Sequence, residues 1–215
     1  MDKSIFLSAS IPDARRGEQF AESADTVAIA AAVSALVNVT LGRRILVWGG
    51  HPAITPMIWA IAEAIDVDYG SWVQLYQSRY FRDEYPEDNE RFRNITYTED
   101  IQHDFEKSLH AMRKRMLSER AYSAAVFIGG RVGVVEEFSM LRAYQPDAKL
   151  LPVVTTGGAA LQIAKDVPSL SEDFATDYDY VAVFHRHLGI SPKERRYRKP
   201  EDQPADVRNR LWSPE

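Results

Sequence analysis

Short apolar runs alternate with longer helical patterns along most of this chain, and this alternation constrains the fold more than any other feature. We expect strands at residues 4–10, 43–50, 71–78, 94–98, 124–130 and 149–158, and helices at 24–42, 55–65, 99–120, 134–144 and 159–167. Strand–helix–strand units of this spacing form right-handed parallel crossovers. The sequence therefore predicts an α/β fold: a single doubly wound, mostly parallel Rossmann-like sheet with helices on both faces.

The composition is that of one ordinary globular domain. The 215 residues carry a formal net charge of −5 and no cysteine. This charge favours neither nucleic acid nor an anionic membrane surface as a partner, and the missing thiols exclude disulfides and thiolate chemistry. Because neither a signal peptide nor an apolar membrane segment is evident, we expect a cytoplasmic protein. We divide it into a binding domain, 1–189, and a polar, proline-rich tail, 190–215, which is either weakly ordered or held on the surface.

The pattern over residues 99–120 is the clearest helical one in the chain. Ile101, Phe105, Leu109, Met112 and Met116 form an apolar stripe, with charged residues between them. Such a stripe either packs into the core or forms a contact between subunits. We expect a homodimer in solution, with this stripe as one candidate surface.

Four of the expected strands end in small or glycine-rich sequences. The carboxyl ends of parallel strands lie at one edge of a sheet, and glycine lets the backbone approach a ligand closely. A helix N-terminus that follows such a loop attracts phosphate. The alternative is that these glycines form ordinary strand-to-helix turns that bind no ligand. We expect Thr55 to be the N-cap of the helix that follows the second loop. The expected ligand-binding residues are Ser8, Ala9, Ser10, Gly49, Gly50, His51, Thr55, Gly129, Gly130, Arg131, Gly133, Glu136, Thr155, Thr156, Gly157 and Gly158.

Two motifs give the chain a resemblance to a known family. "VWGGHPAITPMIW" follows the second strand, and "IGGRVGVVEE" follows the fifth. They resemble the glycine-rich loop and the Pro-Gly-Gly-x-Gly-Thr-x-x-Glu motif of the SLOG superfamily. This superfamily of Rossmann-fold proteins includes the LONELY GUY phosphoribohydrolases and lysine-decarboxylase-like proteins. The resemblance covers about residues 4–164 and implies that Glu137 and Arg113 are the catalytic residues, Arg113 matching the arginine of a Met-His-x-Arg-Lys helix.

The second motif departs from the family pattern in three ways. Ile128 replaces the proline, Val134 replaces the phosphate-binding threonine, and one extra residue lies between Gly130 and Gly133. These departures favour the sensor branch of the superfamily, in which such loops bind ADP-ribose-like or cyclic nucleotide signals without cleaving them. A carboxylate at position 137 is also explained without catalysis, because the first turn of a helix favours negative charge.

Three functions stay open on the sequence. The first is a nucleotide-binding sensor or accessory domain for a phosphorylated nucleotide or ADP-ribose-like signal. The second is an N-glycoside hydrolase acting on nucleoside 5′-monophosphates or related nucleotides, in which a carboxylate stabilises an oxocarbenium-like transition state or positions water. The third is a protein-interaction module that uses the aromatic loop 79–93 and the tail.

Metals and resident cofactors are not expected. The five histidines are scattered and show no spacing of metal ligands. In the loop 79–93, Arg79, Tyr80, Phe81 and Arg82 are suited to stacking on a base or to a subunit contact. The expected partner is therefore a nucleotide or a nucleotide-derived small molecule.

Overall fold

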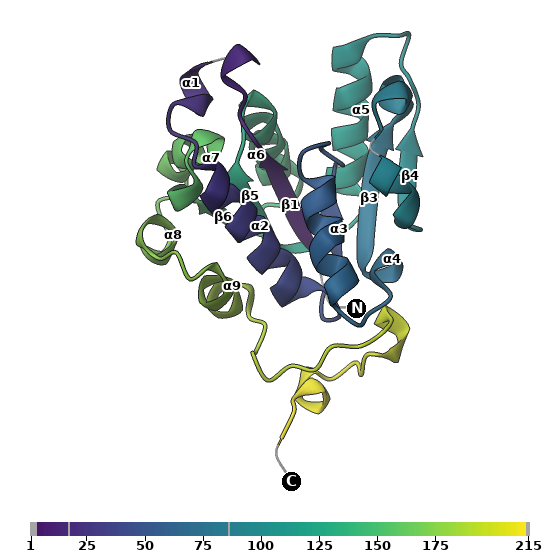
Figure 1. Ribbon diagram of the computed structural model, residues 1–215, viewed down its shortest axis with the longest axis vertical. Coiled ribbons are helices and arrows are strands. Elements are labelled where there is room, and N and C mark those ends of the chain that lie inside the picture. The colour runs from purple at the N-terminus through teal and green to yellow at the C-terminus, as the bar shows by residue number, and fades with distance from the viewer. Residues whose placement is uncertain (1–3, 17, 86, 214–215) are drawn as a thin grey trace.

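The computed structural model describes residues 4–16, 18–85 and 87–213. The strands within them form one six-stranded sheet (Figure 1). All strand pairs are parallel, and the strand order is β4-β3-β2-β1-β5-β6. The α/β, Rossmann-like prediction is therefore confirmed. The strands are β1 (Ser4–Ser10), β2 (Leu46–Trp48), β3 (Val73–Ser78), β4 (Ile95–Thr98), β5 (Tyr122–Gly129) and β6 (Lys149–Val153).

Helices cover both faces of this sheet. The described helices are α1 (Glu18–Ala21), α2 (Thr26–Thr40), α3 (Thr55–Ala64), α4 (Tyr69–Trp72), α5 (Phe105–Ser118), α6 (Val132–Tyr144), α7 (Gly158–Ile163), α8 (Asp173–Thr176) and α9 (Tyr180–Leu188). Buried side chains of α2, α3 and α9 join one apolar core, and those of α5, α6 and α7 join the other. The sheet therefore separates two cores, as doubly wound folds require.

The order of the strands reverses beside β1. From β1 the chain adds β2, β3 and β4 on one side, then crosses over to place β5 and β6 on the other. The register pairs Ser10 with Gly129, so the last residues of β1 and β5 lie side by side. The carboxyl ends of these two strands form the topological switch point, where open α/β sheets bind their ligands.

The N-cap predicted for α3 and the start predicted for the helix at 99–120 are wrong. Thr55 is the first residue of α3, and Ile54 occupies the N-cap position. The Thr55 side chain is buried and donates to the carbonyl oxygen of His51 at 3.2 Å. The helix predicted from residue 99 begins at Phe105, because Gln102 and His103 have φ angles of 58° and 54° and Asp104 caps the first turn.

The C-terminal half of the apolar stripe of α5 lies inside the protein. Met116 is fully buried, and Met112 is almost fully buried in the core between α5, α6 and the sheet. These two methionines are therefore core residues and supply no dimer surface. The homodimer itself stays a prediction.

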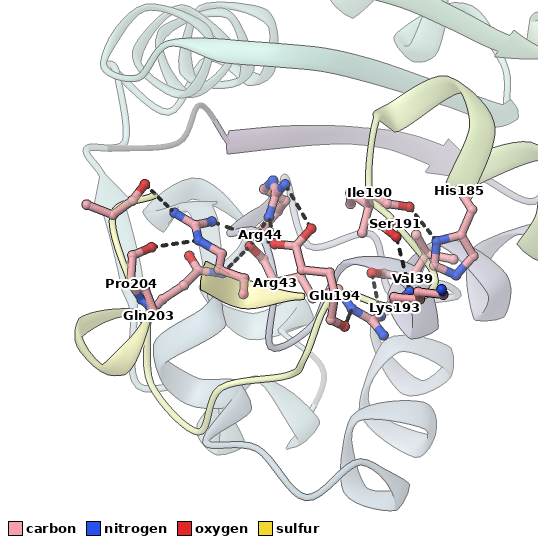
Figure 2. A network of polar contacts seen from close by, with 12 residues as sticks. Val39, Arg43, Arg44, His185, Ile190, Ser191, Lys193, Glu194, Gln203 and Pro204 are labelled. Atoms are coloured by element: carbon pink, nitrogen blue, oxygen red, sulfur yellow. Dashed lines mark hydrogen bonds and ion pairs between the residues drawn. The ribbon is translucent and has the colours of Figure 1, made fainter. Parts of the chain in front are cut away.

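The tail is held across the opposite edge of the sheet, below α4 and the start of β3 (Figure 1). The Trp72 indole N–H donates to the carbonyl oxygens of Tyr197 and Arg198 at 3.0 and 3.1 Å. Figure 2 shows Glu194 among arginines that precede β2, and its carboxylate accepts from Arg44 at 2.6 Å. The boundary after residue 189 stays a prediction. Residues 1–3 of the predicted domain and 214–215 of the tail lie outside the described residues.

Candidate functional site

A cavity of about 530 Å³ opens at the carboxyl edge of the sheet, beside the switch point. It is bounded by the ends of β1 and β2, the loop before α3, the segment after β3, the inner face of α5 and the start of α6. Ten of the predicted site residues line this cavity: Ala9, Ser10, Gly49, Gly50, His51, Arg113, Arg131, Gly133, Glu136 and Glu137.

A charged network forms one wall of the cavity. Arg113 projects from α5, and its Nε donates to Glu137 Oε1 at 3.3 Å while its Nη1 donates to Glu136. The hydroxyl of Ser8, on β1, donates to the other oxygen of Glu137 at 2.5 Å. Three elements therefore fix the Glu137 carboxylate. Because α6 begins at Val132, Glu136 and Glu137 lie in its second turn, so first-turn dipole stabilisation does not explain them.

The Glu137 carboxyl group is more buried than is usual for a group that carries a negative charge. Its side chain is 15% exposed, whereas that of Glu136 is 47% exposed. Burial raises the pKa of Glu137, and the Arg113 guanidinium and the Ser8 hydroxyl only partly offset this effect. The site therefore holds a carboxyl group that is fixed in position and carries a desolvation cost, which is typical of functional clefts.

Unpaired donors lie next to this carboxyl group. In the described part of the chain, Nη2 of Arg113 makes no hydrogen bond, and it would lie 2.7 Å from a Cβ atom built on Gly133. The N–H groups of Val132 and Gly133 belong to the first turn of α6, where intrahelical acceptors do not exist. Among the described residues they also have no other partner. A guanidinium and the start of a 13-residue helix thus offer donors to one anion.

Gly129 and Gly130 shape the turn but do not line the cavity. The Gly130 N–H donates to the Ser10 carbonyl at 2.8 Å, and the Gly129 N–H donates to Thr156 Oγ1 at 2.8 Å. A Cβ on Gly130 would meet a methyl group of Val134 at 2.4 Å. Their backbone donors are therefore used within the fold, and Val134 fills the space beside them.

The loop after β2 closes on itself through His51. The carbonyl oxygen of His51 accepts from the N–H groups of Ile54 and Thr55, and its Nδ1 accepts from Ala53 at 3.2 Å. Gly50 has a φ of +69°, and a Cβ there would overlap the Gln77 amide at 1.6 Å. The glycine is therefore needed for packing, while Gly49, Gly50 and His51 still line the cavity.

The loop after β6 packs away from the cavity. Thr156 is fully buried, and its hydroxyl donates to the Val153 carbonyl at 2.6 Å. The Thr155 hydroxyl pairs with the Tyr180 hydroxyl at 3.0 Å, and the Gly158 N–H donates to Ser23 at 3.2 Å. Thr155, Thr156, Gly157 and Gly158 are therefore not brought together with Glu137, and their role in binding stays a prediction.

The sequence analysis identified only part of the aromatic rim of the cavity: it named Phe81 as suited to stacking on a base, but it did not name Tyr85 or assign Phe105 to the site. Phe81, Tyr85 and Phe105 line the cavity mouth, and Phe105 is 44% exposed. Burial raises the pKa of Tyr85 to about 12, and its hydroxyl donates to the Ser78 carbonyl at 2.7 Å. Phe105 was assigned only to an apolar stripe, because no local pattern reveals that a helix begins there and turns its first ring toward a cavity.

The described residues contain no group of three or more histidine, aspartate or glutamate side chains that could hold a metal ion. The same residues include no helix with the length and apolarity needed to cross a membrane.

The fold and the cavity define a Rossmann-like α/β protein with its candidate site at the switch point. A family model described as the SLOG cluster3 family matches residues 19–188. The chain therefore belongs to the SLOG cluster3 family, which confirms the resemblance to the SLOG superfamily and suggests a nucleotide-related function. A search of curated proteins found no match, and a search of solved structures found none either.

Proposed function

We propose that the cavity binds a phosphorylated nucleotide or an ADP-ribose-like signal, and that the protein is a sensor or accessory domain for it. One observation carries this proposal: unpaired donors of Arg113 and of the α6 start face a cavity at the switch point, beside a fixed carboxylate. Phosphate needs such donors, and a carboxylate is a good acceptor for ribose hydroxyl groups.

The phosphate would lie between Nη2 of Arg113 and the N–H groups of Val132 and Gly133. Arg131, the N-cap residue, lines the same cavity and adds positive charge beside this turn. Glu137 would then face the ribose. This arrangement uses the first turn of α6, since the N–H groups of the two glycines before it are already bonded.

A binding role fits the chemistry of the wall better than turnover does. Val134 brings methyl groups where a threonine would bring a hydroxyl donor, so one phosphate contact is missing. Both oxygens of Glu137 already accept hydrogen bonds, from Ser8 and Arg113. A carboxylate occupied in this way is less available to activate water, and a loosely placed phosphate costs catalysis heavily.

A ligand panel tests the proposal. AMP and ADP-ribose should raise the melting temperature in a concentration-dependent way, whereas adenine should not. Arg131→Ala should weaken the shift, because it removes one positive charge from the wall. Arg142→Ala, an exposed arginine near the end of α6, is the matched control and should leave the shift unchanged. If no nucleotide in the panel stabilises the protein at millimolar concentration, the proposal fails.

A second candidate is an N-glycoside hydrolase, and the buried Glu137 favours it. Burial raises the pKa of this carboxyl group toward the range in which acids and bases work at neutral pH. If the protein is a hydrolase, the wild type releases free base from AMP, and Glu137→Gln lowers the rate by about 100-fold or more. If chromatography detects no free base from the wild type, the sensor function stands.

A further inference from the structure

Three aromatic rings form a cluster at the mouth of the cavity. The ring centroids of Tyr80 and Phe81 are 5.0 Å apart, and those of Phe81 and Phe105 are 5.5 Å apart with an interplanar angle of 89°. Tyr80 and Phe105 are separated by 6.0 Å. These edge-to-face contacts hold the rings in fixed orientations. Phe81 and Phe105 line the cavity, whereas Tyr80 supports them from outside it.

Phe105 and Arg113 lie on the same helix and line the same cavity. They are eight residues apart in α5, which corresponds to about 12 Å along the axis. Leu109 lies midway and also lines the cavity. One face of α5 thus carries an anion-binding group at one end and an aromatic group at the other. This spacing suits an extended nucleotide, with its phosphate at Arg113 and its base near the rings.

The charges of the rim set the orientation of such a ligand. Glu84 and Glu106 are exposed and line the cavity near Phe81 and Phe105. In the described part of the chain neither carboxylate has a hydrogen-bond or ion-pair partner. Like charges repel, so a phosphate is disfavoured at the aromatic end. A planar base is favoured there, since its faces stack on aromatic rings and its N–H groups can donate to carboxylates.

We propose that Phe81 and Phe105 form a base-stacking subsite, so that the ligand of this cavity carries an aromatic base and enters with its phosphate toward Arg113. This inference rests on the proposed function. It assigns specificity for nucleotides over sugar phosphates to two aromatic residues, Phe105 at the start of α5 and Phe81 in the segment after β3.

Calorimetric titration of AMP and of ribose 5-phosphate tests this subsite. Phe105→Leu keeps an apolar side chain but removes the aromatic face. It should weaken AMP binding by about tenfold, in line with the usual contribution of one stacked base, and should change ribose 5-phosphate affinity by less than twofold. Phe81→Leu should act in the same direction. Tyr144→Ala is the matched control, because Tyr144 is 41% exposed at the end of α6.

The outcomes distinguish a failure of the base-stacking subsite from a failure of the proposed function. If the wild type binds AMP and the two phenylalanine variants bind it equally well, the subsite is wrong and nucleotide binding stands. An equal loss for AMP and ribose 5-phosphate also overturns the subsite, because it indicates a general distortion of the cavity. If the wild type binds no nucleotide, both the function and the subsite fail. Should ribose 5-phosphate bind too weakly to measure, the AMP affinities of the variants and the control decide.

Discussion

Two arginine–glutamate clusters lie at opposite edges of the sheet. One is closed, which means that it is buried within the protein, and the other is open to a cavity. At the edge where the strands start, the side chain of Glu194, a tail residue, is fully buried. Its carboxylate accepts hydrogen bonds from both terminal nitrogens of Arg44. Nη1 of Arg210 lies 3.7 Å from the same carboxylate. Arg43 donates to the Glu194 carbonyl at 2.8 Å, and burial lowers the pKa of Arg43 to about 10.

At the edge where the strands end, the second cluster is open. Arg113 and Glu137 line a cavity, and Nη2 of Arg113 keeps its donors unused among the described residues. The second partner, Glu136, is half exposed. The same pair of residue types therefore holds the tail at one edge and, in the proposed function, would hold a ligand at the other. Unused donors beside a cavity distinguish the two.

The largest effect should come from the closed cluster. Glu194→Ala removes the buried carboxylate that pairs with Arg44 and lies beside Arg210. Breaking a buried pair in this way costs about 3–5 kcal/mol of the free energy of unfolding. For a chain of this size the melting temperature should fall by about 10 °C. Glu201→Ala, on the exposed part of the tail, is the control. A Glu194→Ala protein that melts with the wild type would show that the tail contributes nothing.

The next effect separates binding from stability at the open cluster. A Cβ on Gly133 would lie 2.7 Å from Nη2 of Arg113, so Gly133→Ala should displace the guanidinium and weaken AMP binding by tenfold or more. Alanine also favours helix by up to about 1 kcal/mol over glycine, so the melting temperature without ligand should hold or rise. Calorimetry and thermal denaturation give the two quantities. Undiminished AMP affinity would place the phosphate elsewhere.

A pH-dependent effect should come from Glu137. Its pKa is raised in the folded protein, so the native state keeps the proton to a higher pH than the unfolded chain does. Between the two pKa values the free energy of unfolding therefore falls as the pH rises. Glu137→Gln removes this titration, so the melting temperature of the variant relative to that of the wild type should rise with pH until the raised pKa of Glu137 is passed. Glu172→Gln, an exposed residue, controls for the lost charge. A difference that shrinks with rising pH would contradict the assigned direction.

The smallest effect should be a gain in affinity for AMP. Glu136 holds Nη1 of Arg113 at the rim of the cavity, and its charge opposes an incoming phosphate. Glu136→Gln should tighten AMP binding a few-fold at low salt, and the gain should shrink at high salt, where surface charges are screened. Titrations at two salt concentrations measure it. Weaker binding by this variant would mean that Glu136 contacts the ligand directly.

The fold was predictable because periodicity and spacing are local properties of the sequence. Each strand used for the α/β prediction exists, with bounds that shift by a few residues. Helix ends were less predictable, since Ile54 caps α3 without any side-chain bond and positive φ angles at Gln102 and His103 delay α5.

The site was only partly predictable. Gly49 and Gly133, which the glycine-rich loops predicted to bind a ligand, line the strand-end cavity, and their role in binding stays a prediction. No sequence pattern shows that the N–H groups of Gly129 and Gly130 are bonded within the fold. That outcome depends on Ser10, at the end of β1, and Thr156, in the turn after β6. Phe105 also lines the cavity because segments that are distant in the sequence pack together there.

The most direct test of the account is a titration of AMP followed by the backbone amide signals of the protein in nuclear magnetic resonance. Because the proposed phosphate site is the start of α6, the amide signals of Val132 and Gly133 should shift most, and Gly133→Ala should suppress the shift of Val132. The amides of Gly157 and Gly158, which lie outside the cavity wall, should move little. Shifts centred on Gly157 and Gly158, with Val132 and Gly133 unchanged, would contradict the central claim.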